Sequence, residues 1–211
     1  MNEAVRQGPR LFVVSAPSGG GKTSLVSALL EQDDRVTLSV SHTTRAPRPG
    51  ERDGVHYHFV DEDSFLGLVE QNAFLEHARV FDRRYGTGRA AVEKQLADGL
   101  DVLLDIDWQG ARQIRENYPS CVTVFIVPPS LEELRRRLSR RGQDSDEIIE
   151  RRMRDARAEI SHWEEFDFLI VNDRFDAALA DLAGIVRNGQ PDRELHSEKQ
   201  QKILAELLET G

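Results

Sequence analysis

The chain has 211 residues, a formal net charge of −9 at pH 7 and 31% charged residues, which is typical of one soluble globular protein. The acidic balance excludes a general nucleic-acid binder, because such a protein needs a cationic surface to displace counterions from phosphates. Cys121 is the single cysteine and excludes an intrachain disulfide framework. No apolar stretch approaches the roughly 18 residues of a membrane span, so we expect a cytoplasmic protein that contacts neither membrane nor nucleic acid.

The first predicted element is a short apolar strand at residues 11–14, followed by a glycine-rich segment and the start of a helix. This order is typical of a phosphate-binding loop, in which backbone N–H groups and a helix N-terminus surround phosphate oxygens. Lys22 would then neutralise the terminal phosphates, and Thr23 would place a hydroxyl on Mg²⁺. Ala16 stands where the strict pattern has glycine, which is acceptable if its φ is negative. The alternative is a glycine-rich connection with an incidental lysine. The segment reads Ala16-Pro17-Ser18-Gly19-Gly20-Gly21-Lys22-Thr23-Ser24.

A segment rich in Arg, His, Gly, Pro and aromatic residues runs from about residue 41 to 89, and we expect it to form an inserted lobe. Within it, Asp61 precedes two further acidic residues and an apolar stripe that includes Phe65. Acidic residues suit the positive end of a helix dipole, so this pattern predicts a helix beginning at residues 61–64.

Two arginines of this lobe, Arg45 and Arg48, are separated by three positions and accompanied by prolines and hydroxyl residues. Planar guanidinium groups bind phosphate in a bidentate manner. Tyr57, Tyr85 and Thr87 follow and are suited to the same pocket. We therefore predict a second phosphate site, with an exposed basic turn as the alternative.

Further apolar strands are predicted at residues 102–106, 122–127 and 168–171, with helical patterns between them. Asp105 and Asp107 flank Ile106, so strand alternation would send both carboxylates to one side. Asp105 lies where a carboxylate helps to organise Mg²⁺ and its waters. A helix cap is the alternative role for Asp107.

Residues 131–159 are rich in Arg and Glu and predict a helical pair broken at Gly142. Arg137 and Arg141 are one helical turn apart and Arg152 is on the next helix, so the three can converge on a triphosphate. Phosphoryl transfer needs such positive charge more than a strong base. Many other arginines surround these three, so the alternative for each is a solvated side chain without a role in catalysis.

The C-terminal tail, residues 190–211, contains an apolar stripe at helical spacing. We expect it to dock on the chain's own core, with a contact between subunits of a homo-oligomer as the alternative. The stripe consists of Ile203, Leu204, Leu207 and Leu208.

Several separated motifs resemble those of guanylate kinases in order and spacing, over nearly all of residues 10–188. The resemblance implies an α/β fold with a P-loop NTPase-type parallel sheet flanked by helices, an inserted mixed α/β GMP-binding lobe and a helical lid. It places core segments at 1–40, 94–130 and 161–189, the lobe at 41–93, the lid at 131–160 and a helical tail at 190–211. The motifs are residues 39–59, Phe74-Leu75-Glu76, Tyr85-Gly86-Thr87, residues 104–107 with Gln109-Gly110, Pro128-Pro129-Ser130, Arg140-Arg141-Gly142 and Val171-Asn172-Asp173.

The resemblance also implies a role for each matching residue. For the GMP phosphate it implies Ser41, Arg45, Arg48, Tyr57 and Tyr85, and for the guanine Glu76, Thr87 and Asp107. For ATP it implies residues 16–24 with Asn172 and Asp173. For catalysis it implies Lys22, Arg45, Arg137, Arg141 and Arg152. For Mg²⁺ it implies Thr23 and Asp105, which would hold the ion partly through water. Asn172 and Asp173 are alternatively turn caps.

The chemistry of guanine supports the assignment of Glu76. Guanine offers two donors, N1–H and the exocyclic N2–H, which one carboxylate accepts together, whereas adenine has an acceptor at N1. The alternative is that Glu76 is exposed to solvent. The expected activity is Mg²⁺-dependent transfer of the ATP γ-phosphoryl group to GMP, and also to dGMP. The rival interpretations are a binding module without activity, a P-loop kinase for another acceptor and a switch GTPase.

Overall fold

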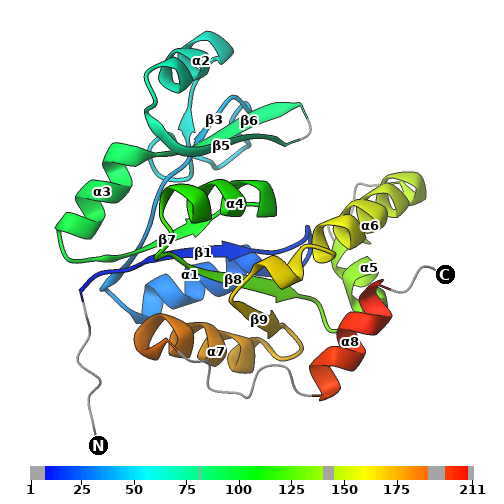
Figure 1. Cartoon of the computed structure of the whole chain (residues 1–211). Coiled ribbons are helices and arrows are strands. Elements are labelled where there is room, and N and C mark those ends of the chain that lie inside the picture. Colours follow the sequence, from blue (N-terminus) through cyan, green and yellow to red (C-terminus); the bar gives the residue numbers. More distant parts are fainter. Residues whose placement is uncertain (1–7, 81, 140–144, 190–197, 209–211) are drawn as a thin grey trace, which may run out of the picture. The chain divides into compact units, whose positions relative to one another are not determined.

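A computed structural model of the chain describes residues 8–80, 82–139, 145–189 and 198–208 (Figure 1). The strands are β1 (Leu11–Ser15), β2 (Val36–Leu38), β3 (His42–Thr43), β4 (His58–Phe59), β5 (Phe74–Val80), β6 (Arg83–Gly88), β7 (Asp101–Asp105), β8 (Val122–Val127) and β9 (Phe168–Val171). The helices are α1 (Lys22–Gln32), α2 (Glu62–Glu70), α3 (Arg89–Ala97), α4 (Trp108–Asn117), α5 (Leu131–Ser139), α6 (Asp146–Ile160), the 3₁₀ turn η1 (Trp163–Glu165), α7 (Phe175–Asn188) and α8 (Glu198–Leu208).

The strands form two sheets, which confirms the predicted α/β class. One sheet has five strands in the order β2-β7-β1-β8-β9, and the other has four in the order β4-β3-β6-β5. The described residues divide into two compact units. The phosphate-loop unit comprises Val14–Asp33 and the described residues from Thr123 onward. The insertion unit comprises residues 8–13 and Asp34–Val122.

In the phosphate-loop unit, the predicted strands β8 and β9 pair in parallel with Val124 opposite Phe168 and Val127 opposite Val171. Helix α1 packs against α7 in the same unit. Strands such as these, buried on both sides, read as continuous apolar runs because helices cover both faces of a parallel sheet. This is why their positions could be predicted from the sequence.

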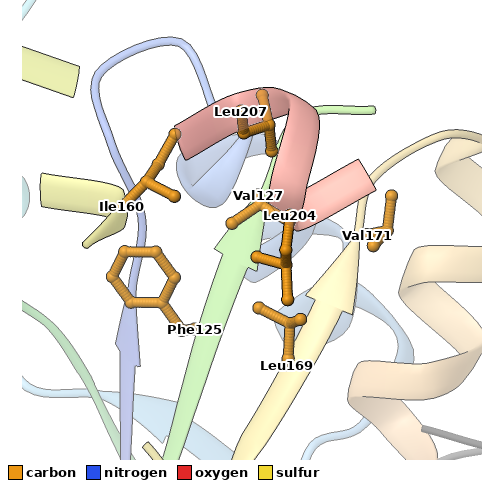
Figure 2. Packing of buried hydrophobic residues seen from close by; sticks show 7 residues of the cluster. All are labelled: Phe125, Val127, Ile160, Leu169, Val171, Leu204 and Leu207. Atoms are coloured by element: carbon orange, nitrogen blue, oxygen red, sulfur yellow. The ribbon is translucent and has the colours of Figure 1, made fainter. Parts of the chain in front are cut away.

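The C-terminal helix α8 docks on its own unit, as predicted. Leu204 and Leu207 are 5% and 0% exposed and pack in one cluster with residues of β8, β9 and α6 (Figure 2). The buried members of this cluster are Phe125, Val127, Ile160, Leu169, Val171, Leu204 and Leu207. Ile203, Leu204 and Leu207 of the predicted stripe thus pack inside this chain, whereas Leu208 is 37% exposed.

The predicted helical pair at residues 131–159 is present as α5 and α6, which pack through an apolar cluster of their own. Ser145 caps α6, because its Oγ accepts from the N–H of Ile148. Gly142 and Arg141 lie outside the described residues. The cluster consists of Leu134, Leu138, Ile149, Met153 and Ala156.

In the insertion unit, β7 pairs in parallel with β2, a three-residue strand that the sequence patterns did not predict. Strand β7 ends at Asp105, one residue earlier than expected. Asp107 lies two residues beyond the end of this strand, but its backbone is still extended, with φ −81° and ψ 177°. That both carboxylates face one side stays a prediction.

The smaller sheet and α2 form the lobe within the insertion unit. Helix α2 begins where predicted, because the side chain of Asp61 accepts from the N–H of Ser64 at 2.7 Å. Phe65 is fully buried on this helix and stacks on Phe74 of β5, with ring centroids 4.7 Å apart. In the part of the chain that the structure describes, no helix has the length and apolar character that a membrane crossing requires.

Candidate active site

The phosphate loop of the first unit depends on glycine backbone geometry. Gly19 and Gly21 have φ values of 88° and 97°, in the left-handed region that glycine adopts without strain. The N–H of Gly20 donates to the carbonyl of Pro17 at 2.8 Å and closes a turn. Helix α1 then begins at Lys22, as predicted, so the loop leads into a helix N-terminus. Ala16 has a negative φ, since Asn72 is the one non-glycine residue with positive φ among those described, and alanine is therefore tolerated there.

The carbonyl of Gly20 is held by Asn172, which is predicted to bind ATP, and by Arg137, which is predicted to be catalytic. It accepts from Nδ2 of Asn172 at 2.9 Å and from Nη1 of Arg137 at 3.3 Å. Nη2 of Arg137 also donates to the carbonyl of Asn172 at 3.0 Å. A side chain at Gly21 would clash with Nδ2 of Asn172, so this residue must remain glycine. Arg137, Asn172 and the loop thus form one connected cluster in the phosphate-loop unit.

A second lid arginine also reaches the loop. Nη2 of Arg152 donates to Oγ of Ser18 at 2.9 Å, and the N–H of Ser18 donates to Oε2 of Glu159 at 3.2 Å. Sequence reasoning missed Glu159, because nothing in a charged helix distinguishes one glutamate from its neighbours. Arg141, the third predicted lid residue, lies outside the described residues. Asp173 accepts from the N–H of Arg174 at 2.8 Å, which fits its alternative role in a turn.

Other arginines of the lid pair with lid glutamates. Arg135 is bonded to Glu150, and Arg136 and Arg137 share Glu133, with Nε to carboxylate distances of 2.7 and 2.8 Å. Burial opposes the ionisation of Glu133, but hydrogen bonds from Arg137 and Arg136 outweigh it and lower its pKa. Glu133 therefore orients the guanidinium of Arg137, which the carbonyls of Gly20 and Asn172 also hold.

The predicted second phosphate site centres on Arg45. Its Nη2 donates to Oε1 of Glu51 at 2.8 Å, and Oε2 of Glu51 accepts from the N–H of Arg48 at 2.7 Å. Hydrogen bonds from Arg45 and from the Arg48 backbone lower the pKa of Glu51 to about 2. Sequence reasoning missed Glu51, although its position three residues after Arg48 suits a turn-closing side chain. The side chain of Arg48 lies on the exposed turn itself.

Aromatic residues surround the Arg45 guanidinium. Its Cζ lies 5.3 Å from the ring centroid of Tyr57 and 5.9 Å from that of Phe59. The rings of Tyr57 and Tyr85 meet edge to face with centroids 5.9 Å apart. Burial raises the pKa of Tyr57, and the charge of Asp105 raises it further. The structure thus brings together Arg45, Tyr57 and Tyr85, while Ser41 is half-buried and accepts through its carbonyl from His58.

Glu76 is buried, and the alternative of an exposed side chain is therefore wrong. It is 3% exposed, and its Oε1 accepts from Oγ1 of Thr87 at 2.6 Å. Burial raises the pKa of Glu76 to about 7 against the opposing hydrogen bond from Thr87, and the charge of Asp107 raises it further. The three residues predicted to contact guanine therefore lie near one another. Among the described residues, no cation contacts this carboxylate. A buried carboxylate of this kind is unusual and is typical of a functional site.

Asp107 has the capping role that was the alternative at the sequence level. Its Oδ1 accepts from the N–H of Gly110 at 2.9 Å, so it caps α4. Its Oδ2 accepts from Nε2 of Gln109 at 3.3 Å. The cap fixes one carboxylate oxygen firmly and leaves the other held by a flexible side chain. The capping role and the predicted contact with guanine are therefore compatible.

The predicted Mg²⁺ ligands have suitable chemistry. Thr23 is exposed in the first turn of α1, and Asp105 is half-buried at the carboxyl end of β7. A hydroxyl and a carboxylate are hard oxygen ligands, which Mg²⁺ prefers, and this ion usually takes its other ligands from water and substrate phosphates. Among the described residues, no three His, Cys, Asp or Glu side chains gather as a metal cluster.

A glycine-rich loop at a helix N-terminus, approached by arginines of a helical pair, defines the class of P-loop kinases. Comparison with known proteins narrows this class. The family model described as guanylate kinase matches residues 8–189. The chain is 61% identical over 198 residues to the guanylate kinase of Alkalilimnicola ehrlichii, covering 94% of this chain and 96% of that protein.

Two further relatives agree. The guanylate kinase of Photorhabdus laumondii is 54% identical over 200 residues, covering 94% of this chain and 97% of that protein. The crystal structure of guanylate kinase from Anaplasma phagocytophilum superposes with a TM-score of 0.73 at 35% identity and covers 95% of each chain. The chain therefore belongs to the guanylate kinase family, and it is a kinase.

Proposed function

We propose that the chain catalyses Mg²⁺-dependent transfer of the γ-phosphoryl group of ATP to GMP, with dGMP as a second acceptor. The observation that carries the choice of guanine is the buried Glu76 carboxylate beside Thr87 and Asp107. Two N–H donors of guanine would satisfy its oxygens, whereas the acceptor at N1 of adenine would repel it. We propose dGMP as well, because it carries the same phosphate and the same base as GMP and would use the same assigned residues.

We propose that ATP binds at the phosphate loop, with Lys22 on its terminal phosphates. The left-handed glycines and the start of α1 support this assignment, because both expose backbone N–H groups to an anion. Thr23 and Asp105 would hold Mg²⁺, which when bound neutralises charge on the β- and γ-phosphates. Asn172 contacts the loop, which supports its assignment to ATP, and its contact with adenosine stays a prediction.

The phosphate of GMP would bind at Arg45. In the structure its guanidinium is paired with Glu51, so the arginine is held in place before a phosphate arrives. Tyr57 and Tyr85 line the same guanidinium and would add phenolic donors. Arg48 and Ser41 would complete the phosphate site, Arg48 from its exposed turn.

During transfer, an oxygen of the GMP phosphate attacks the γ-phosphorus, and the bond from that phosphorus to the bridging oxygen of ADP breaks. The products are GDP and ADP. The attacking phosphate is largely ionised near pH 7, since its second pKa is about 6, so no general base is required. Arg137, Arg152 and Arg141 would stabilise the charge on the transferred group. Arg137 and Arg152 already contact the loop, which supports this role.

A coupled assay of ADP formation tests the proposal. Purified protein with ATP and Mg²⁺ should form ADP when GMP or dGMP is added, and much more slowly with IMP, AMP or UMP. A binding module would form no ADP, and a kinase for another acceptor would prefer a different monophosphate. ADP formation without any acceptor would instead indicate a nucleotide hydrolase. Any of these three results would overturn the proposal.

We also propose a cytoplasmic location, where ATP and GMP are both available. For the C-terminal helix, the burial of Leu204 and Leu207 against the chain's own β8 and β9 favours an intrachain role. Sedimentation tests the alternative, a contact between subunits through this helix.

A further inference from the structure

The backbone around Glu76 has an irregular geometry. In the part of the chain that the structure describes, strand β5 is at the edge of its sheet and pairs with β6 alone. Phe74 lies opposite Gly88 and Glu76 lies opposite Thr87, so the register shifts by one residue at Leu75. Such β-bulges redirect the neighbouring side chains, and they are common beside active sites. The bulge therefore sets the direction of Glu76, but an edge strand alone would hold it loosely.

Two side chains of α4 bond the backbone on each side of Glu76. Nδ2 of Asn117 donates to the carbonyl of Leu75 at 2.9 Å. The amide of Gln113 makes two bonds with His77, accepting from its N–H at 3.1 Å and donating to its carbonyl at 2.9 Å. The helix thus supplies, through side chains, the hydrogen bonds that a further strand would give the free edge of β5. Helix α4 and strand β5 pack closely (Figure 1).

Gly110 leaves space for the carboxylate itself. A Cβ at this position would lie 2.7 Å from Oε2 of Glu76 and 3.2 Å from Cδ1 of Ile106. Residues 110, 113 and 117 are three and four positions apart and therefore share one helix face. Asp107 caps the same helix. One rigid element thus carries Asp107 and supports the backbone around Glu76.

We propose that Gln113 and Asn117 are positioning residues that determine guanine selectivity by fixing the Glu76 carboxylate relative to Asp107. The inference rests on the proposed role of Glu76 in binding guanine. Neither residue touches the nucleotide; each acts through the backbone of residues 75 and 77. A displacement of about 1 Å in a binding group can reduce a rate by up to about 100-fold, so small shifts of β5 matter.

The test measures kcat and KM for GMP and for IMP, with the KM for ATP as an internal reference. IMP lacks the 2-amino group and so forfeits one of the two bonds to Glu76. In Gln113→Ala and Asn117→Ala, we expect the KM for GMP to rise about tenfold, roughly the value of one lost hydrogen bond. The preference for GMP over IMP should fall, while the KM for ATP stays unchanged. Glu116→Ala, on an exposed position of the same helix, is the matched control.

Two further variants complete the experiment, one a milder change at position 113 and the other a change of Glu76 itself. Gln113→Glu keeps the acceptor for His77 N–H and loses the donor, so it should have an intermediate effect and guards against failure to fold. Glu76→Gln tests the underlying assignment separately. In the Glu76→Gln background, Gln113→Ala should no longer change the preference for GMP over IMP, because positioning acts through Glu76.

The outcomes are distinguishable. If Glu76→Gln loses the preference but the α4 variants keep it, the positioning role is wrong and the proposed function stands. If the α4 variants lower only the melting temperature or the kcat for both acceptors equally, their role is structural and the inference is also wrong. If Glu76→Gln itself keeps the wild-type preference for GMP over IMP, the proposed role of Glu76 is wrong, and the inference that rests on it is wrong as well.

Discussion

The ionisation of Glu76 should control GMP binding between pH 6 and pH 8. Burial raises the pKa of this carboxyl to about 7. It is therefore ionised in about one molecule in ten at pH 6 and in about nine in ten at pH 8. Only the ionised form accepts both guanine donors, so the affinity for GMP is reduced by the fraction that is protonated. We expect the Kd for GMP to be about tenfold higher at pH 6 than at pH 8.

Isothermal titration of GMP into wild type and Glu76→Gln between pH 5.5 and pH 8.5 measures this effect. The GMP phosphate itself titrates with a pKa of about 6 and contributes equally to both proteins. The difference between the two profiles therefore isolates Glu76. Titration with a non-hydrolysable ATP analogue is the control for general pH effects. Parallel profiles in the two proteins would refute the reasoning.

The same pKa predicts that the stability of the fold depends on pH in the opposite direction from the affinity for GMP. The pKa of Glu76 in the folded state lies above its unfolded value of 4.5, so the protonated form is favoured by folding. The contribution is fully present below pH 4.5 and is lost as the pH rises through about 7. The loss is about 3 kcal/mol. Urea unfolding of wild type and Glu76→Gln should show their difference in unfolding free energy changing across this window, and a constant difference would contradict the assignment.

Three further variants test other parts of the site and fold. Lys22→Met should abolish ADP formation with an unchanged melting temperature, and retained turnover would contradict the loop assignment. Arg137→Ala should lower kcat by about 10² to 10³, whereas Arg136→Ala, paired with the same glutamate, should stay near wild type; equal effects would remove the preference for Arg137. Leu207→Ala should reduce the unfolding free energy by about 2–5 kcal/mol with no change in sedimenting mass, and a lower mass would indicate a contact between subunits.

The features that were predicted correctly from the sequence depend on residues that are close together along the chain. Strands β8 and β9 are buried on both faces, so they read as apolar runs whatever surrounds them. The phosphate loop needs glycines at fixed positions before a lysine, and its geometry at Gly19 and Gly21 is local. The helix cap at Asp61 is equally local, because the capping oxygen and the N–H it binds are three residues apart.

The features that could not be predicted depend on contacts between distant segments. Strand β5, residues 74–80, has no strict alternation because the bulge between Phe74 and Glu76 interrupts the period of two. The bulge at Leu75 inserts a residue whose carbonyl is satisfied 42 positions away, at Asn117. Strand β2 has three residues, too few for a period to appear. No pattern in a single sequence encodes such pairings.

The burial of Glu76 connects stability with selectivity. At neutral pH, an ionised carboxylate that is only 3% exposed costs free energy unless hydrogen bonds replace the water it has lost. The side chain of Thr87 donates one such hydrogen bond. A base with two N–H donors would compensate the cost that remains after the hydrogen bonds from Thr87. Adenine would leave the carboxylate facing an acceptor, so the cost would remain and repulsion would be added. Guanine selectivity in the proposed reaction therefore arises from a desolvated charge that the free protein tolerates by raising its pKa.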